Sequence, residues 1–158
     1  MCTVSTHQDG KTLLVTMNRD EARSRGPELP PEFGVVACLL NGYLPGAGAR
    51  RARPEKARTR GEIVPRLLTM GDAGPVRHEL LTAFDPTPYP SFTLLLATTK
   101  SVEAFFWSGD RALQYDRFHD EWHMVTSSAW NTAAVCTWRR RAFDQWRASQ
   151  VMRDGIPE

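Results

Sequence analysis

The sequence lacks any hydrophobic run long enough to cross a bilayer, and no segment has the pattern of a signal peptide. It has only three cysteines, Cys2, Cys38 and Cys136, and their wide spacing fits neither a disulfide framework nor a zinc site. The formal net charge of +2 is too small to argue for a nucleic-acid partner. We therefore expect a cytoplasmic protein with no membrane span, no nucleic-acid partner, no metal and no cofactor.

The remaining composition is ordinary. The 158 residues make one domain's length, and 41% hydrophobic with 24% charged residues is typical of a globular protein with a real core. Cys38 and Cys136 are expected to be buried, inert thiols. Cys2 differs from them because of its position at the start of the chain.

The first 21 residues predict a β-hairpin. Two short strands are joined at Asp9-Gly10, a dipeptide that accepts the positive φ angles of a tight turn. An antiparallel hairpin brings its open ends side by side. One open end carries Cys2, and the other carries a run of four polar residues, Asn18, Arg19, Asp20 and Glu21.

This arrangement predicts an activated nucleophile. If Met1 is removed, Cys2 becomes the first residue and carries a free α-amine, which titrates near pH 7.7 to 8.0 in model compounds. That amine can take the proton of the Cys2 thiol, while the nearby Arg19 favours the thiolate and lowers the thiol pKa. Nucleophile and base would then belong to one residue.

The middle of the chain predicts a buried strand and two helices. Residues 34–40 form a continuous apolar run that ends at Asn41-Gly42, which by itself is most simply a turn. The arginine-rich residues 43–57 predict a solvated loop; an anion or nucleic-acid site is the weaker alternative, since no aromatic residues interleave with the charges. Thr59 and Glu62 have the spacing of a capping box before a helix over residues 60–70, and a second helix is expected over residues 75–83.

The last third predicts a meander and a helix. Strands are expected over residues 92–98, 102–108, 112–118 and 122–126, which favours an α+β domain. His119 and His123 flank a turn between the last two strands and are expected to be solvated rather than to bind a metal. From residue 131 or 132 a helix is predicted with one apolar face, made of Val135, Trp138, Ala142 and Trp146, and with Arg139, Arg140, Arg141 and Arg147 mainly off that face.

Several motifs carry a family resemblance. The opening Met1-Cys2, the Asn18-Arg19-Asp20-Glu21 tetrad, residues 34–41 (GVVACLLN) and residues 58–62 (RTRGE) resemble, in this order, the NRDE family, also called the transport and Golgi organisation family. That family is similar in its opening to N-terminal nucleophile hydrolases of the penicillin V acylase and bile salt hydrolase type. The resemblance implies a single NRDE-like domain with a shortened αββα sandwich. It also implies that the asparagine at position 41 stabilises the oxyanion of a tetrahedral intermediate.

The sequence departs from the family pattern at two places. A segment with Gly-Gly-Thr-Trp is missing between the tetrad and the strand that ends in Asn41, so a strand or pocket wall is absent. The family's later Ser-Asn pair corresponds to Ser127-Ser128, in which the Ser128 hydroxyl can still donate a hydrogen bond. The arginine that follows late in those hydrolases corresponds to any of Arg139, Arg140 and Arg141.

Two functions are consistent with these residues. The first is an N-terminal cysteine amidohydrolase that cleaves a linear C–N amide bond: catalysis would use Cys2, Arg19, Asp20 and Asn41, and substrate contacts would come from Asn18, Glu21 and Ser128. The second is a non-catalytic scaffold of the same family that binds a small molecule, such as a lipid or haem-type ligand. In that case the tetrad is structural and Cys2 is a buried strand residue.

Overall fold

The computed structural model describes residues 2–19, 34–42, 58–109, 112–127 and 132–154. Within these ranges the chain forms seven strands, one short 3-10 helix and three α-helices. The strands are β1 (Cys2–Gln8), β2 (Leu13–Arg19), β3 (Val36–Asn41), β4 (Phe92–Ala97), β5 (Val102–Trp107), β6 (Gln114–Phe118) and β7 (Trp122–Ser127). The helices are η1 (Arg60–Glu62), α1 (Ile63–Leu68), α2 (Ala73–Thr82) and α3 (Thr132–Asp154).

The predicted hairpin is confirmed. β1 and β2 are antiparallel with Cys2 opposite Arg19 and Gln8 opposite Leu13. At the turn, Gly10 has a φ of 85°, and the Asp9 carboxylate accepts hydrogen bonds from the backbone N–H groups of Lys11 and Thr12. β1 also pairs with β7, so the three-stranded sheet has the order β2-β1-β7 and β1 lies at its centre.

The second sheet contains the predicted meander. Strands β4, β5 and β6 follow one another by antiparallel pairing, and β3 adds on the other side of β4 to give the order β3-β4-β5-β6. Every residue of β4 is buried, since this strand has neighbours at both edges and on both faces. The fold is therefore a mixed α+β fold with two antiparallel sheets, as the order of the sequence patterns predicts.

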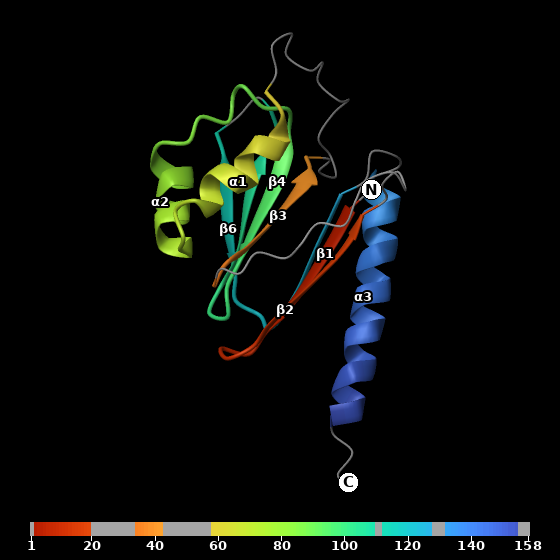
Figure 1. Cartoon of the computed structure of the whole chain (residues 1–158). Coiled ribbons are helices and arrows are strands. Elements are labelled where there is room, and N and C mark those ends of the chain that lie inside the picture. Colours follow the sequence, from red (N-terminus) through yellow and green to blue (C-terminus); the bar gives the residue numbers. More distant parts are fainter. Residues whose placement is uncertain (1, 20–33, 43–57, 110–111, 128–131, 155–158) are drawn as a thin grey trace, which may run out of the picture.

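The elements stack in layers (Figure 1). α1 and α2 cover one face of the four-stranded sheet, and their Ile63, Leu67 and Val76 pack with Phe92 and Phe105 in one core. A second core lies between the two sheets, where Val4 of β1 meets apolar residues of β3, β4 and β5. α3 lies along the outer face of the three-stranded sheet, on the side away from α1 and α2.

The predicted capping box is wrong in its second half. Thr59 is the N-cap of η1, and its hydroxyl accepts the N–H of Gly61 at 3.3 Å. Glu62 does not reach back to Thr59, because its carboxylate accepts two hydrogen bonds from the Arg58 guanidinium, at 2.6 and 2.9 Å. The first turn is consequently a 3-10 helix, and the α-helix begins only at Ile63.

The predicted apolar face of α3 is also partly wrong. Trp138 is 68% exposed and Trp146 is 43% exposed, whereas Phe143 is buried. Arg139, which was expected off the packed face, is half-buried. The helix contacts β7 through Cys136, Arg139 and Arg140, each of which hydrogen-bonds a residue of that strand. No helix in the described ranges is long and apolar enough to cross a membrane.

One ion pair joins a helix layer to the four-stranded sheet. Glu103 of β5 is fully buried, and the Arg77 guanidinium of α2 donates to both of its carboxylate oxygens, at 2.6 and 2.7 Å. A second cation, Arg117 of β6, has its Nε 4.0 Å from the same carboxylate. A buried carboxylate needs such partners, because its desolvation penalty is several kcal/mol.

We predict that Arg77→Met lowers the free energy of unfolding by about 3 kcal/mol or more, because it leaves the buried Glu103 carboxylate without its bidentate partner. Urea denaturation followed by circular dichroism measures this loss. The matched control is Arg66→Met, which breaks the more exposed Arg66–Glu79 pair of α1 and α2 and should cost less than about 1 kcal/mol. Equal losses of unfolding free energy in the two variants would contradict the stabilising role of the Arg77–Glu103 pair. The double variant Arg77→Met/Glu103→Leu should recover part of the stability lost in Arg77→Met, because it removes the unpaired carboxylate.

Candidate functional site

The structure places the start of β1 beside the end of β2 and the end of β7. Cys2 is opposite Arg19 on one side and opposite Ser127 on the other, and Thr3 is opposite Asn18. For Cys2, Asn18 and Arg19 the structure describes the backbone. Asp20, Glu21 and Ser128 lie outside the described residues. The juxtaposition of Cys2 with Arg19 is the part of the predicted site that the hairpin register confirms.

Asn41 approaches the same region from the other sheet. It is the last residue of β3, opposite Phe92, and β3 lies against β1 and β7 across the space between the sheets. Figure 1 shows the end of β3 at the same end of the molecule as the start of β1. Asn41-Gly42 does not form the simple turn, because the Gly42 N–H continues the ladder to the Ser91 carbonyl at 3.0 Å.

Glycine is required at position 42 by a close backbone approach. A Cβ built on Gly42 would lie 2.4 Å from the backbone nitrogen of Phe92 and 2.4 Å from the carbonyl carbon of Ser91. No side chain fits at such distances, so this position accepts only glycine. The contact holds the end of β3, and with it Asn41, against the start of β4.

Arg139 is the one of the three late arginines that lies toward the Cys2 end of β1. Its Nη1 donates to the Thr126 hydroxyl at 2.7 Å and to the Ser127 carbonyl at 3.4 Å, and Ser127 is opposite Cys2. Arg140 instead donates to the Met124 carbonyl at 3.0 Å, farther along β7. The helix pattern alone did not select Arg139, because the selection depends on which side of α3 faces the sheet.

The other two cysteines are in poor positions for nucleophilic chemistry. Cys38 is buried between the two sheets, as predicted. Cys136 of α3 was expected to be buried but is only half-buried, with its Sγ 4.0 Å from the Thr126 carbonyl, and this burial raises the pKa of its thiol. A raised pKa reduces the thiolate fraction near neutral pH, so both thiols serve as internal references for the reactivity of Cys2.

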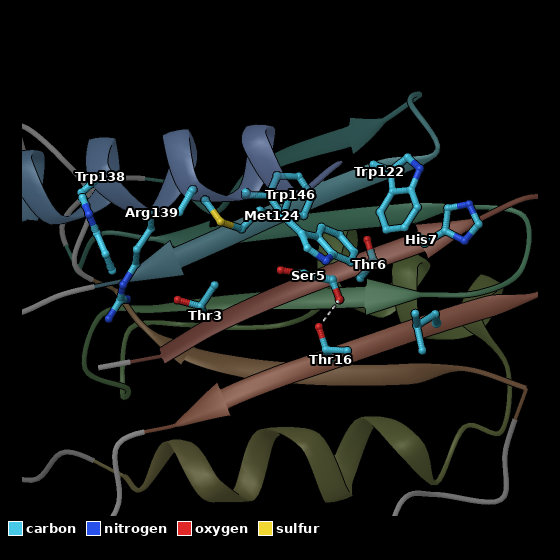
Figure 2. Close-up of a pocket in the computed structure, with 13 residues that line it drawn as sticks. Thr3, Ser5, Thr6, His7, Thr16, Trp122, Met124, Trp138, Arg139 and Trp146 are labelled. Carbon is cyan, nitrogen blue, oxygen red and sulfur yellow. Dashed lines mark hydrogen bonds between the residues drawn. The ribbon is translucent and has the colours of Figure 1, made fainter. Parts of the chain in front are cut away.

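A cavity of about 440 Å³ lies between α3 and the outer face of the three-stranded sheet (Figure 2). Its floor comes from residues of β1, β2 and β7, and its wall comes from α3. The lining residues are Thr3, Ser5, Thr6, His7, Leu14, Thr16, Trp122, Met124, Trp138, Arg139, Ala142, Phe143 and Trp146. We call this cavity the α3 cleft. The sequence pattern did not reveal it, because the tryptophans were expected in a core.

The expectation of two solvated turn histidines is wrong for His123. Its side chain is 7% exposed, its ring stacks on Phe118 with centroids 4.7 Å apart, and a ring nitrogen hydrogen-bonds the Asp120 carbonyl. Burial lowers the pKa of His123, and the positive charge of Arg140 nearby acts in the same direction. The neutral imidazole is therefore the form that the fold accommodates.

Comparisons with known proteins returned nothing: no family model, no curated protein and no solved structure matches this chain. The resemblance to the NRDE family accordingly stays a prediction from the sequence motifs.

We predict that stability falls as the pH drops through about 6.5, the ordinary histidine pKa, because the folded-state pKa of His123 lies lower. Between these two pKa values the unfolded chain binds a proton that the folded chain does not, so stability rises with pH there and the loss ends below the folded pKa. Thermal unfolding across this pH range measures the effect. His123→Leu should flatten the dependence, whereas His119→Gln, in the exposed turn beside it, should leave it unchanged; identical profiles for both variants would contradict this account.

Proposed function

We propose that this protein is an N-terminal cysteine amidohydrolase that cleaves a linear C–N amide bond. The observation that carries the proposal is the position of Cys2: it begins the central strand of its sheet, opposite Arg19 on one neighbour and Ser127 on the other. A strand that is hydrogen-bonded on both sides holds its first residue in a defined place. Such fixed placement of a nucleophile is what covalent catalysis requires.

The proposed reaction has two steps. The Cys2 sulfur attacks the amide carbonyl carbon while the α-amine of Cys2, free after removal of Met1, takes the thiol proton and passes it to the leaving amine. The resulting thioester is then cleaved by water, which releases the acid and restores the thiol. Arg19 favours the thiolate and Asp20 orients the amine. The Asn41 side-chain amide donates to the oxyanion, an interaction that removes roughly 3 kcal/mol or more from the barrier.

The fold supports the proposal at the level of layers. Helices, a four-stranded sheet, a three-stranded sheet and a helix stack in that order, which is compatible with a shortened αββα sandwich of the N-terminal nucleophile hydrolases. Arg139, which reaches Thr126 and Ser127, is our choice for the late arginine of that family. Membership of the NRDE family and a cytoplasmic location belong to the same proposal.

A second candidate function is a non-catalytic scaffold that binds a small molecule. The observation that favours it is the α3 cleft, whose volume of about 440 Å³ falls in the range of small-ligand sites. In this case Cys2 is an ordinary strand residue. The two candidates differ in whether Cys2 is chemically activated, and this difference can be measured directly.

We predict that the purified protein lacks Met1 and that a limiting amount of iodoacetamide at neutral pH modifies Cys2 well before Cys38 or Cys136. The reason is that Arg19 and the α-amine increase the thiolate fraction of Cys2, whereas the other two thiols are buried or have a raised pKa. Intact mass before and after labelling, followed by peptide mapping, gives both results. Retention of Met1, or labelling of Cys136 as fast as Cys2, would remove the first step of the mechanism.

We predict that Cys2→Ala abolishes turnover of any amide found by screening a library of N-acyl amino acids, without lowering the unfolding temperature below that of Cys136→Ala. Asn41→Ala should lower kcat by about 100- to 1000-fold, with a smaller change in KM, because the asparagine acts on the transition state. Steady-state kinetics and thermal unfolding check these expectations. Full activity of Cys2→Ala would end the hydrolase proposal.

A further inference from the structure

The α3 cleft has a largely polar floor and an aromatic wall. Thr3, Ser5 and His7 alternate along β1 on the face of the sheet toward α3, with Thr16 of β2 opposite Ser5. Figure 2 shows these side chains below the helix, with Thr3 toward one end of the cleft and His7 toward the other. The cleft therefore extends along β1 from Thr3 to His7, and its two ends differ chemically.

The end near His7 is aromatic. The His7 and Trp122 rings stack with centroids 4.1 Å apart, and Trp146 of α3 meets Trp122 edge-on at 5.1 Å. The ring centroids of Phe143 and Trp146 are 5.9 Å apart, and the buried Met124 also lines the cleft. Such a group of rings offers a planar apolar molecule both stacked and edge contacts.

The end near Thr3 is polar and positively charged. Arg139 lines the cleft here, and the Thr126 hydroxyl that accepts from it lies 2.9 Å from the Thr3 hydroxyl. The Arg139 guanidinium brings a positive charge to this end of the cleft, and such a group suits an anionic ligand.

We propose that the α3 cleft binds an aromatic carboxylic acid, with its ring system packed against the aromatic group that includes Trp122 and Trp146 and its carboxylate at Arg139 and Thr3. This inference rests on the second candidate function, a scaffold that binds a small molecule, and names the class of its ligand; it requires no reaction at Cys2. The volume of about 440 Å³ accommodates a molecule of one or two rings, and small-ligand sites with mostly apolar walls and a few polar groups have this character.

The test uses 2-naphthoate as the probe. Isothermal titration calorimetry of the full chain should give one site with a dissociation constant of about 1 mM or tighter, the affinity of an ordinary ligand of this size. In the ¹⁵N spectrum the indole signals of Trp122 and Trp146 should shift. The indole of Trp107 is the internal control: it donates to the Tyr89 carbonyl in the other core and should not move.

Two variants of α3 give a matched comparison. Ala142 lines the cleft between Trp138 and Trp146, whereas Ala148 is an exposed alanine of the same helix that does not line it. Ala142→Trp should fill the cleft and weaken 2-naphthoate binding by about tenfold or more, the usual effect of occupying a small-ligand site. Ala148→Trp should bind as the unmodified chain does. Equal affinity of the two variants would overturn the assignment of the site.

The charge requirement is tested separately. Arg139→Gln should weaken binding of 2-naphthoate by about tenfold or more, the usual effect of losing a hydrogen bond to a charged group, and should not change the affinity for the neutral 2-naphthalenemethanol. Equal affinities of the unmodified chain for the acid and the alcohol would overturn the anion assignment. Binding to Cys2→Ala should match that of the unmodified chain, which distinguishes a failure of the cleft assignment from a failure of the proposed chemistry at Cys2.

Discussion

The structure depends on the simultaneous pairing of β1 with β2 and β7. Because β1 is hydrogen-bonded on both edges, its register decides what meets each of its residues. Cys2 is placed between Arg19 and Ser127, while Val4 is buried toward the other sheet and Ser5 and His7 face the α3 cleft. A shift of one residue would exchange the two faces and would separate both candidate sites from their partners.

The four-stranded sheet supplies the rigid support behind this strand. β4 is buried along its whole length, and the bidentate contact of Arg77 with the buried Glu103 ties α2 to β5. At the edge of this sheet, Gly42 lets the end of β3 approach β4 closely enough to define where Asn41 stops. Asn41 therefore reaches the Cys2 end of the molecule as part of a packed sheet, not as part of a separate loop.

Sequence reasoning succeeded where the signal is local. The Asp9-Gly10 turn was enough to predict that the open ends of the hairpin, which carry Cys2 and Arg19, lie side by side. Apolar runs bounded by turn residues predicted strands, and the spacing of apolar residues predicted α3. Sequence reasoning failed where the position of a side chain depends on a contact that the local pattern does not include. The Glu62 carboxylate pairs with Arg58 and not with Thr59, and His123 packs on Phe118 and bonds Asp120. On α3, the packing against the three-stranded sheet buries Phe143 and leaves Trp138 exposed.

The same limit explains the candidate sites. Cys2, Arg19 and Asn41 could be identified from motifs and strand ends. Arg139 and the α3 cleft could not, because three consecutive arginines look alike in a sequence and only the packing of α3 on β7 distinguishes them.

The most direct test of the central claim, that Cys2 is an activated nucleophile, is the pH dependence of its alkylation rate in a Cys38→Ala/Cys136→Ala background. An activated thiol gives a rate that reaches its plateau well below the ordinary cysteine pKa of about 8.5, and Arg19→Gln should move that plateau to higher pH. A rate that rises through about 8.5, unchanged by Arg19→Gln, would contradict the claim.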